Sequence, residues 1–225
     1  MKESKRYSAI CLWLGILFTT TLMLSNIIVQ KQFVLFGLVF AASAILQPLF
    51  YVISDITSEL YGYKVSRTLK MYAILINLFM VVIFTAAIKI PPAPWFQNQE
   101  AFQLVLGNTW RIVLASMTAV FIGDWLSNVI FDKMKRKHGD KGFPLRSAAT
   151  SLISSLLDSA IFFLVAFLGV IPILPLLGII FSAGLLVKVV YQLICIPFVH
   201  VLIKKLKVIE GDSYEPTDNY RIFGG

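Results

Sequence analysis

Ionisable side chains stand in three apolar stretches of this chain, where a charge is costly. Asp124, Asp158 and Lys188 each lie well inside a run of residues apolar enough to cross a bilayer. A charged side chain at the bilayer centre costs about 3 kcal/mol on insertion scales, so such residues usually face a bundle interior or a watery cavity. Two acids and one lysine do not balance, and an excess buried carboxylate requires a proton, a cation or a donor-rich ligand. The imbalance favours a ligand site between helices.

Amide side chains accompany two of these charges. Asn128 follows Asp124 by one helical turn, and Gln192 follows Lys188 by one turn, so each pair shares a helix face. These amides are therefore candidates for ligand contact. The alternative for Lys188 is a purely structural role, as a buried counter-ion to one of the two acids.

Asp158 ends a stripe of small hydroxyl residues. Ser147, Ser151 and Ser154 precede it at helical spacing, and Ser155 comes three residues before it. Small polar residues at such a spacing also let helices approach closely and hydrogen-bond across the contact. Helix packing is the favoured interpretation of the stripe, whereas Asp158 and Ser155 are candidates for ligand contact.

A further pair of acids follows the apolar run that ends at Ile53. Asp55 and Glu59 are one turn apart and share a face, although like charges at that spacing repel by roughly a few tenths of a kcal/mol. Pro48 weakens the helix ahead of them, and Gly62 offers a helix stop. Two interpretations stay open: an interface belt with its acids in water, or a broken helix whose end directs both carboxylates into a cavity.

The elements that must position these residues are membrane spans. Of the 225 residues, 58% are hydrophobic and only 14% charged, and the mean hydropathy is +0.81; an ordinary soluble domain is about 25% charged. A span needs about 20 apolar residues. Six segments satisfy this: Ser8–Ile28, Phe33–Ile53, Met71–Ile90, Ile112–Phe131, Ala148–Ile171 and Ile173–Ile203. The sequence therefore predicts an all-α membrane protein with six transmembrane helices, with an irregular entry to the last one and a loop carrying a short amphipathic turn at Asn98–Leu106.

Lys and Arg residues orient these spans. All but four of the 20 gather at the N-terminus, in the segments after the second and fourth spans, and in the C-terminal tail. Positive charge is retained on the cytoplasmic side of a membrane, so we expect both termini to be cytoplasmic. The run KMKRK at residues 133–137 is then a retention signal, and we expect no nucleic-acid partner.

The chain has room for one membrane domain. We expect residues 1–207 to form it, with the bilayer around them, and residues 208–225 to form a polar, disordered cytoplasmic tail. Cys11 and Cys195 lack metal-ligand spacing, and the phosphate-binding pattern G-x-x-x-x-G-K-[ST] is missing from the sequence. We expect no metal, no cofactor and no ATP hydrolysis by this chain.

Four sequence elements together resemble the queuosine precursor transporter family, six-span bacterial membrane proteins of a vitamin-uptake-like group. They are SNII at Ser25–Ile28, SDITSELYGYKVSR at Ser54–Arg67, SLLDSAIFF at Ser155–Phe163, and Lys188 with the later Pro197. The element D-x-x-x-E-x-Y-G, which starts at Asp55, is the most specific of them. The resemblance covers most of the chain and implies uptake of a 7-deazaguanine base, either queuine or its cyano or aminomethyl precursors, at a bacterial cytoplasmic (inner) membrane.

The resemblance also implies which residues matter, and this sequence departs from it at two places. The implied residues are Asn26, Asp55, Glu59, Tyr61, Gly62, Arg67, Arg146, Asp158, Phe162 and Lys188. In the fourth span, where the family often has Gln and then Asp three residues later, the chain has Asp124 and then Ser127. Ser155 stands where the family often has Gln or Asn. The carboxylate of the site is therefore shifted by about one turn.

A guanine-like base suits such side chains. Its edge presents an N–H and an NH₂ side by side, and one carboxylate can accept both hydrogen bonds. Asp158 or Asp124 is the candidate acceptor, and Phe162, Tyr191 or Trp125 could stack on the ring, a contact worth about 1–3 kcal/mol. The candidate donors to the base carbonyl are Lys188, Asn26 and Gln192.

We therefore expect an importer that works by alternating access and is not an enzyme. The alternative is the substrate-binding membrane subunit of a larger energised vitamin-type uptake complex. Less favoured are a channel and an intramembrane aspartyl protease built on Asp124 and Asp158, because Lys188 would disturb the proton that two such acids must share. The energy source and the oligomeric state stay open.

Overall fold

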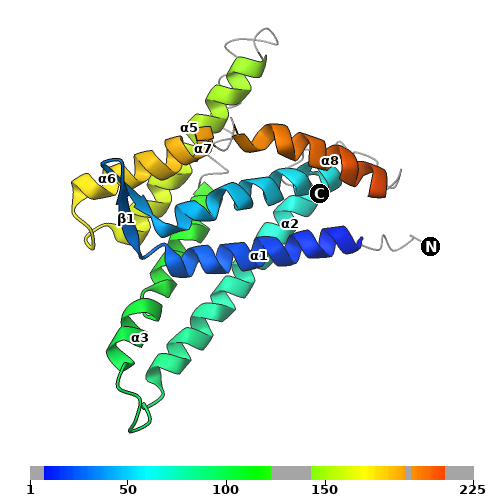
Figure 1. The fold of residues 1–225 in the computed structure, drawn as a ribbon. Coiled ribbons are helices and arrows are strands. Elements are labelled where there is room, and N and C mark those ends of the chain that lie inside the picture. Colours follow the sequence, from blue (N-terminus) through cyan, green and yellow to red (C-terminus); the bar gives the residue numbers. More distant parts are fainter. Residues whose placement is uncertain (1–7, 123–142, 191–193, 211–225) are drawn as a thin grey trace.

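The computed structural model describes residues 8–122, 143–190 and 194–210 (Figure 1). The first helix, α1 (Ala9–Ile28), agrees with the bounds of the first predicted span to within one residue. Ser8 is its N-cap, and the Ser8 Oγ accepts a hydrogen bond from the backbone N–H of Cys11 at 3.1 Å. This bond satisfies one of the amide groups that the start of a helix leaves without an intrahelical partner.

The second predicted span, Phe33–Ile53, is wrong over its first half. Two short strands, β1 (Gln32–Leu35) and β2 (Leu38–Ala41), pair antiparallel there. A 3₁₀ turn, η1 (Ala42–Ile45), follows them.

The physical reason is a tight turn between β-favouring residues. Phe36 and Gly37 have φ angles of 52° and 77°, and a two-residue hairpin turn of type I′ requires positive φ at both positions. Aromatic and β-branched residues flank this turn, and they favour strands. The Phe33 and Phe40 rings stack across the hairpin with their centroids 5.6 Å apart. A short apolar run does not by itself distinguish a strand from a helix.

The next helix, α2 (Gln47–Lys89), is long and is broken at one glycine. Pro48 lies in its first turn, where the missing N–H is tolerated. Gly62 has φ 79° and ψ 168°, so the helix stop predicted there is confirmed. The part after the break, Lys64–Lys89, is long and apolar enough to cross a membrane, in agreement with the third predicted span.

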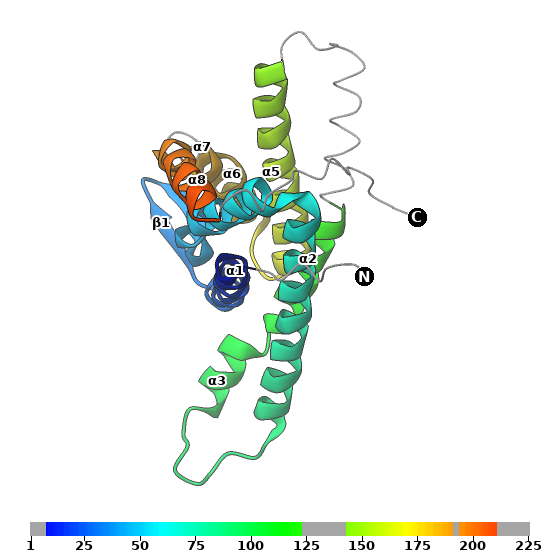
Figure 2. The same ribbon diagram turned by 90° about the vertical axis from the view of Figure 1, so that its right-hand side faces the viewer.

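A helix replaces the loop and amphipathic turn expected at Asn98–Leu106. α3 (Gln99–Leu106) leads through a two-residue turn into a helix over residues 109–122. Together they form a third apolar segment of sufficient length, Gln99–Ile122. The fourth helix therefore starts earlier than the predicted Ile112, and its expected end at Phe131 lies outside the described residues. Figures 1 and 2 show α3 beside the second part of α2, as a paired arm.

The C-terminal third holds one regular helix and one interrupted one. α5 (Phe143–Phe167) agrees with the fifth predicted span, although it ends four residues earlier than Ile171. The sixth, Ile173–Ile203, is helical over its described residues, 173–190 and 194–203, and contains a π-helical turn. It comprises α6 (Ile173–Phe181), a π-helical turn η2 (Ser182–Leu186), α7 (Val187–Val190) and α8 (Ile196–Glu210), and α8 thus continues three residues into the expected tail.

Two clusters of buried apolar side chains hold these elements together. One joins α5, α6 and η2 to β2 around Phe163 and Leu176. The other joins α1, α2 and α8 around Phe18, Leu60 and Val199. The first part of α2 contributes Ile53, Ile56 and Leu60 to the second cluster, and its Tyr51 contacts Ser155 on α5.

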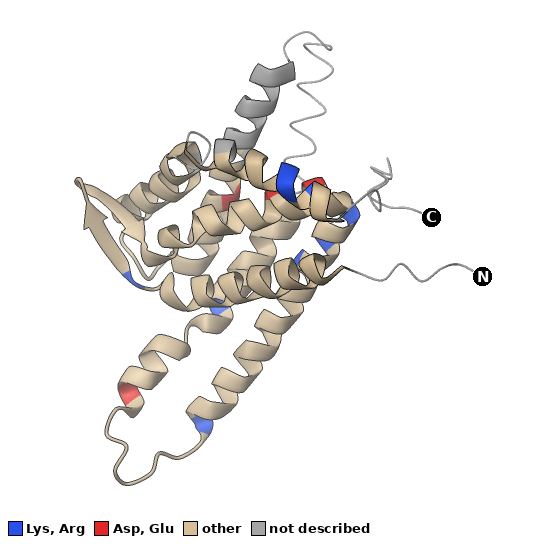
Figure 3. Ribbon diagram, turned by 45° about the vertical axis from the view of Figure 1, so that its right-hand side comes forward, with Lys and Arg blue, Asp and Glu red and all other residues tan. Residues whose placement is uncertain are grey.

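Large apolar side chains also cover the outside of this fold. Trp13, Phe79 and Phe121 are each more than half exposed, and Figure 3 shows long tan stretches of α1 and α2 with few charged positions. Within the described ranges, three helices could cross a membrane by length and composition. The chain is a multi-pass membrane protein; six spans and cytoplasmic termini stay predictions.

Candidate functional site

The acid of the fifth span lies beside a tyrosine from α2. Ser155 on α5 is 8% exposed, and its hydroxyl lies 3.5 Å from the hydroxyl of Tyr51. Asp158 is one turn further along α5, and its Oδ1 is buried. The Tyr51 hydroxyl lies within electrostatic reach of the carboxylates of both Asp158 and Asp55. We call these four residues, Tyr51, Asp55, Ser155 and Asp158, the acidic cluster.

Close backbone packing holds the π-helical turn η2 against α5 beside the acidic cluster. A Cβ atom on Gly184 would lie only 2.9 Å from the Cα of Leu156 and 3.0 Å from the Cβ of Ser159. The π-helical turn that contains Gly184 therefore lies directly against α5, on residues that flank Asp158. Turns of this kind inside α-helices are frequent at functional sites. Ser182 ties the same turn to β2, because its hydroxyl lies 2.7 Å from the carbonyl of Val39.

An aromatic ring lies one turn beyond the acid on α5. Phe162 is partly buried at the edge of the core cluster around Phe163. Its ring meets that of Phe163 edge-on, with centroids 5.0 Å apart and an interplanar angle of 87°. This contact fixes the orientation of Phe162.

The two acids of α2 have different surroundings. Asp55 is exposed, although it lies within reach of Tyr51. Glu59 accepts a 2.6 Å hydrogen bond from Lys207 on α8, in an ion pair whose side chains are about half exposed. The interface interpretation therefore fits Glu59, whereas Asp55 lies within electrostatic reach of Tyr51, which meets α5 at Ser155.

The predicted donor Asn26 already has a protein partner. Its side-chain NH₂ donates to the Asn77 Oδ1 at 2.8 Å, and Asn77 in turn donates to the carbonyl of Ala73 at 2.8 Å. Both asparagines are almost fully buried. This amide pair joins α1 to the second part of α2.

The other predicted residues are placed only in part. Arg146 lies on α5 and Lys188 on α7, but their side chains are outside the described structure. α7 contacts both α5 and α2, so the backbone of Lys188 runs between the two helices that carry the acids. The residues outside the described ranges include Asp124, Trp125, Asn128, Tyr191 and Gln192.

Three residues that sequence reasoning assigned no role shape this region. They are Tyr51, which meets α5; Gly184, which permits the close packing; and Asn77, which pairs with Asn26. Tyr51 and Gly184 each lie one helical turn before a candidate residue, Asp55 and Lys188. That spacing is the only signal of them in the sequence.

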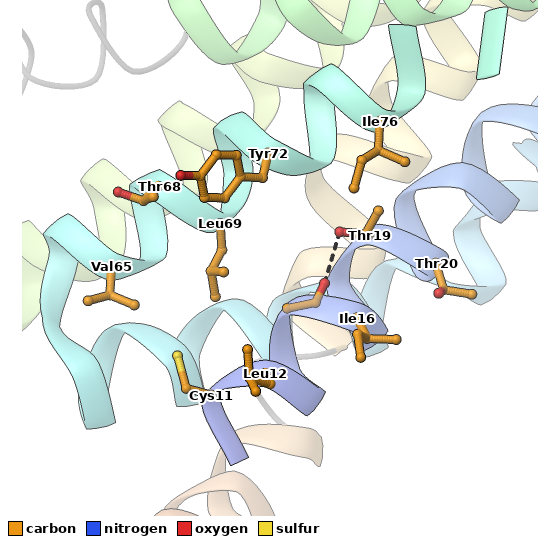
Figure 4. Close-up of a pocket in the computed structure, with 11 residues that line it drawn as sticks. Cys11, Leu12, Ile16, Thr19, Thr20, Val65, Thr68, Leu69, Tyr72 and Ile76 are labelled. Atoms are coloured by element: carbon orange, nitrogen blue, oxygen red, sulfur yellow. Dashed lines mark hydrogen bonds between the residues drawn. The ribbon is translucent and has the colours of Figure 1, made fainter. Parts of the chain in front are cut away.

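An apolar groove of about 530 Å³ lies elsewhere, between α1 and the second part of α2. In Figure 4, Leu12, Ile16 and Thr20 of α1 face Val65, Leu69 and Ile76 of α2. We call it the α1–α2 groove. It contains none of the predicted site residues, and an apolar lining cannot satisfy the polar edge of a purine. The acidic cluster is therefore the better candidate for a polar ligand.

Comparisons with known proteins agree over most of the chain. The model of a family described as "Putative vitamin uptake transporter" matches residues 41–202. A curated protein of Bacillus subtilis (strain 168), "Probable queuosine precursor transporter", is 26% identical over 202 residues, which are 89% of this chain and 86% of that protein. No solved structure matches the chain significantly.

Proposed function

Because the chain belongs to the family described as "Putative vitamin uptake transporter", we propose that it imports a queuosine precursor, a 7-deazaguanine base, by alternating access. The name of the Bacillus subtilis relative supports this substrate class. The membrane would be the bacterial cytoplasmic (inner) membrane. No catalytic step is needed for this function.

The observation that carries the proposal is the position of Asp158. One of its carboxylate oxygens is buried inside a membrane protein, and the carboxylate lies within electrostatic reach of Tyr51 of α2. A carboxylate in such a place is stabilised by each charge-assisted hydrogen bond that it accepts, from the protein or from a ligand. The adjacent N–H and NH₂ of a guanine-like edge provide two parallel donors of this kind.

Neighbouring groups supply the remaining contacts of the proposed site. The hydroxyls of Tyr51 and Ser155 can orient the carboxylate or bind the ring nitrogens, since a hydroxyl both donates and accepts. Phe162 offers a flat face for stacking on the base. Asp55 suits the ammonium group of an aminomethyl precursor, because it is a second acid within reach of the same tyrosine.

Alternating access requires an element that can bend, and α2 provides one. Gly62 has a backbone conformation that other residues rarely adopt, and it separates the part of α2 that carries Tyr51 from the part that is long enough to span. Hinges in transporters and enzymes are often a few residues at the ends of elements. The acidic cluster would then open to one side of the membrane at a time.

We test the proposal by binding and uptake. Queuine and its cyano and aminomethyl precursors should raise the melting temperature of the purified protein, since a ligand bound only by the folded form stabilises it. Asp158→Asn should remove both this shift and the uptake of labelled base into cells that lack their own synthesis. Glu100→Gln, at an acid on α3 in the paired arm, is the control and should behave as wild type.

The outcomes distinguish the alternatives. Normal uptake by Asp158→Asn would assign the contact with the base to another residue. Binding without uptake, restored by co-expressed partner subunits, would identify the substrate-binding subunit of a larger complex. Cleavage of a membrane peptide would point instead to the protease.

A further inference from the structure

The α1–α2 groove is apolar along its whole length and faces outward. Leu12 and Ile16 of α1 are each more than half exposed, and Tyr72 of α2 is 58% exposed. Figure 4 shows side chains of both helices directed into the space between them. In a membrane protein such a surface meets lipid or another protein, not water.

Two of the three threonines that line the groove add little polarity to it. Thr19 donates its hydroxyl hydrogen to the carbonyl of Gly15 at 2.9 Å, and Thr68 donates to that of Lys64 at 2.9 Å. These hydroxyls are satisfied within their own helices, so their methyl groups remain available to an apolar occupant.

The floor of the groove is set by Gly15. A Cβ atom there would lie 3.1 Å from the Leu69 Cδ2, so the glycine allows the Leu69 side chain to approach α1 closely. The groove around this contact has a volume of about 530 Å³.

The length of the groove matches one leaflet. From Cys11 to Thr20 along α1 it measures about 14 Å, and from Val65 to Ile76 along α2 about 16 Å, at 1.5 Å per residue. Half of the hydrocarbon core of a bilayer is about 15 Å. A transmembrane helix of a partner would be expected to seek contact over both leaflets, whereas an acyl chain fills one.

Along α2, basic residues lie toward one end of the groove and not toward the other. Lys64 is exposed and lies one turn before Thr68, which lines the groove. Lysine side chains near helix ends extend their ammonium group to the headgroup level. Beyond Ile76, α2 carries no charge until Lys89. The charge distribution thus fits a single negatively charged headgroup with its tail directed inward.

We propose that the α1–α2 groove binds the acyl chain of an anionic phospholipid and that Lys64 contacts its phosphate. This site is separate from the acidic cluster and does not depend on the proposed substrate. Its occupant would stabilise the packing of α1 against the second part of α2.

Lipid retention tests the proposal. The purified protein is equilibrated with phosphatidylglycerol and phosphatidylcholine of equal chain length and washed, and the retained lipid is counted by native mass spectrometry. We expect wild type to retain phosphatidylglycerol preferentially. Ile16→Trp should fill the groove and lose the retained lipid, whereas Leu17→Trp, the exposed neighbour that does not line the groove, should keep it.

A second pair of variants tests the headgroup. Lys64→Gln should lose the preference for phosphatidylglycerol while still retaining lipid, and Lys70→Gln, on a different face of the same helix, should keep the preference. If Ile16→Trp does not fold, Thr20→Leu fills the groove from its other end and is compared in the same way.

Three results would overturn the proposal. The first is no lipid retained by wild type, and the second is equal retention by the Ile16→Trp and Leu17→Trp variants. The third is a dimer that Ile16→Trp dissociates without changing retained lipid, which would assign the groove to a second copy of the chain.

Discussion

At the scale of single residues, carboxylates that look alike in the sequence have different surroundings. Asp55 and Glu59 are one turn apart on one helix, yet Glu59 pairs with Lys207 at the surface and Asp55 lies within reach of Tyr51. Helical spacing predicts that two residues share a face, but it cannot say which neighbour covers each of them. For Glu59, this neighbour is Lys207, which lies 148 residues further along the chain.

Tyr51→Phe should weaken ligand binding without unfolding the protein. Removal of one neutral hydroxyl contact is worth about 1 kcal/mol, which is roughly a fivefold loss of affinity. Titration calorimetry with queuine measures it. Tyr72→Phe removes a hydroxyl from a tyrosine of α2 at the α1–α2 groove and should leave the affinity unchanged; equal losses in both variants would show that the Tyr51 hydroxyl is not part of the site.

Glu59→Gln should reduce uptake because it breaks the ion pair with Lys207. The stability should change by less than about 1 kcal/mol, since the pair is exposed. The double variant Glu59→Lys with Lys207→Glu rebuilds the pair with reversed charges, and we expect it to restore uptake in the labelled-base assay. An inactive double variant beside an active Lys207→Gln would mean that Glu59 contacts the substrate itself.

At the scale of elements, the periodicity of apolar residues and the positions of capping residues and glycines predict regular helices well. They predict interrupted segments poorly. α1 follows from a twenty-residue, predominantly apolar run behind a serine cap, and the break in α2 follows from Gly62. The β1–β2 hairpin was not predictable as such, because Phe33–Ile53 is uncharged and mostly apolar and the Phe36–Gly37 turn is a weaker signal than Asn-Gly. The π-helical turn η2 depends on packing against α5, which no local pattern contains.

Gly184→Ala should destabilise the protein by about 1–3 kcal/mol, the usual effect of overpacking. Its new methyl group would collide with backbone and side-chain atoms of α5 next to Asp158, so uptake should fall as well. Gly178→Ala is the matched control on α6, because its nearest neighbour would be the Val39 Cβ at 3.9 Å. Thermal unfolding measures both variants, and equal stability would contradict the close packing.

At the scale of the whole molecule, composition predicts the membrane but not the site. The 58% hydrophobic content and the low fraction of charged residues indicate that a lipid bilayer surrounds most of the chain. The candidate site instead depends on a contact between Tyr51 and Ser155, 104 residues apart. Such a contact follows only from how the helices pack, so sequence could name Asp158 as a candidate but not the tyrosine beside it.

Reporter fusions test the orientation predicted from Lys and Arg. An enzyme reporter that is active only in the cytoplasm should be active at both the N-terminus and the C-terminus of the chain, and one that requires export should be inactive at both. This expectation follows from the retention of positive loops inside the cell. Opposite results at the two ends would require an odd number of spans.

The contacts of α1 have a mechanical consequence. α1 touches both sides of the break in α2: Ser8 and Tyr61 share a 2.8 Å hydroxyl contact before Gly62, and Asn26 binds Asn77 after it. α1 therefore bridges the break in α2 and restrains its two parts relative to each other. The hydroxyl pair is only partly buried, whereas the amide pair is buried. If α2 bends at Gly62, we therefore expect the contact between Ser8 and Tyr61 to break first. The hydrogen bond between Asn26 and Asn77 should persist, so that α1 rotates about that end.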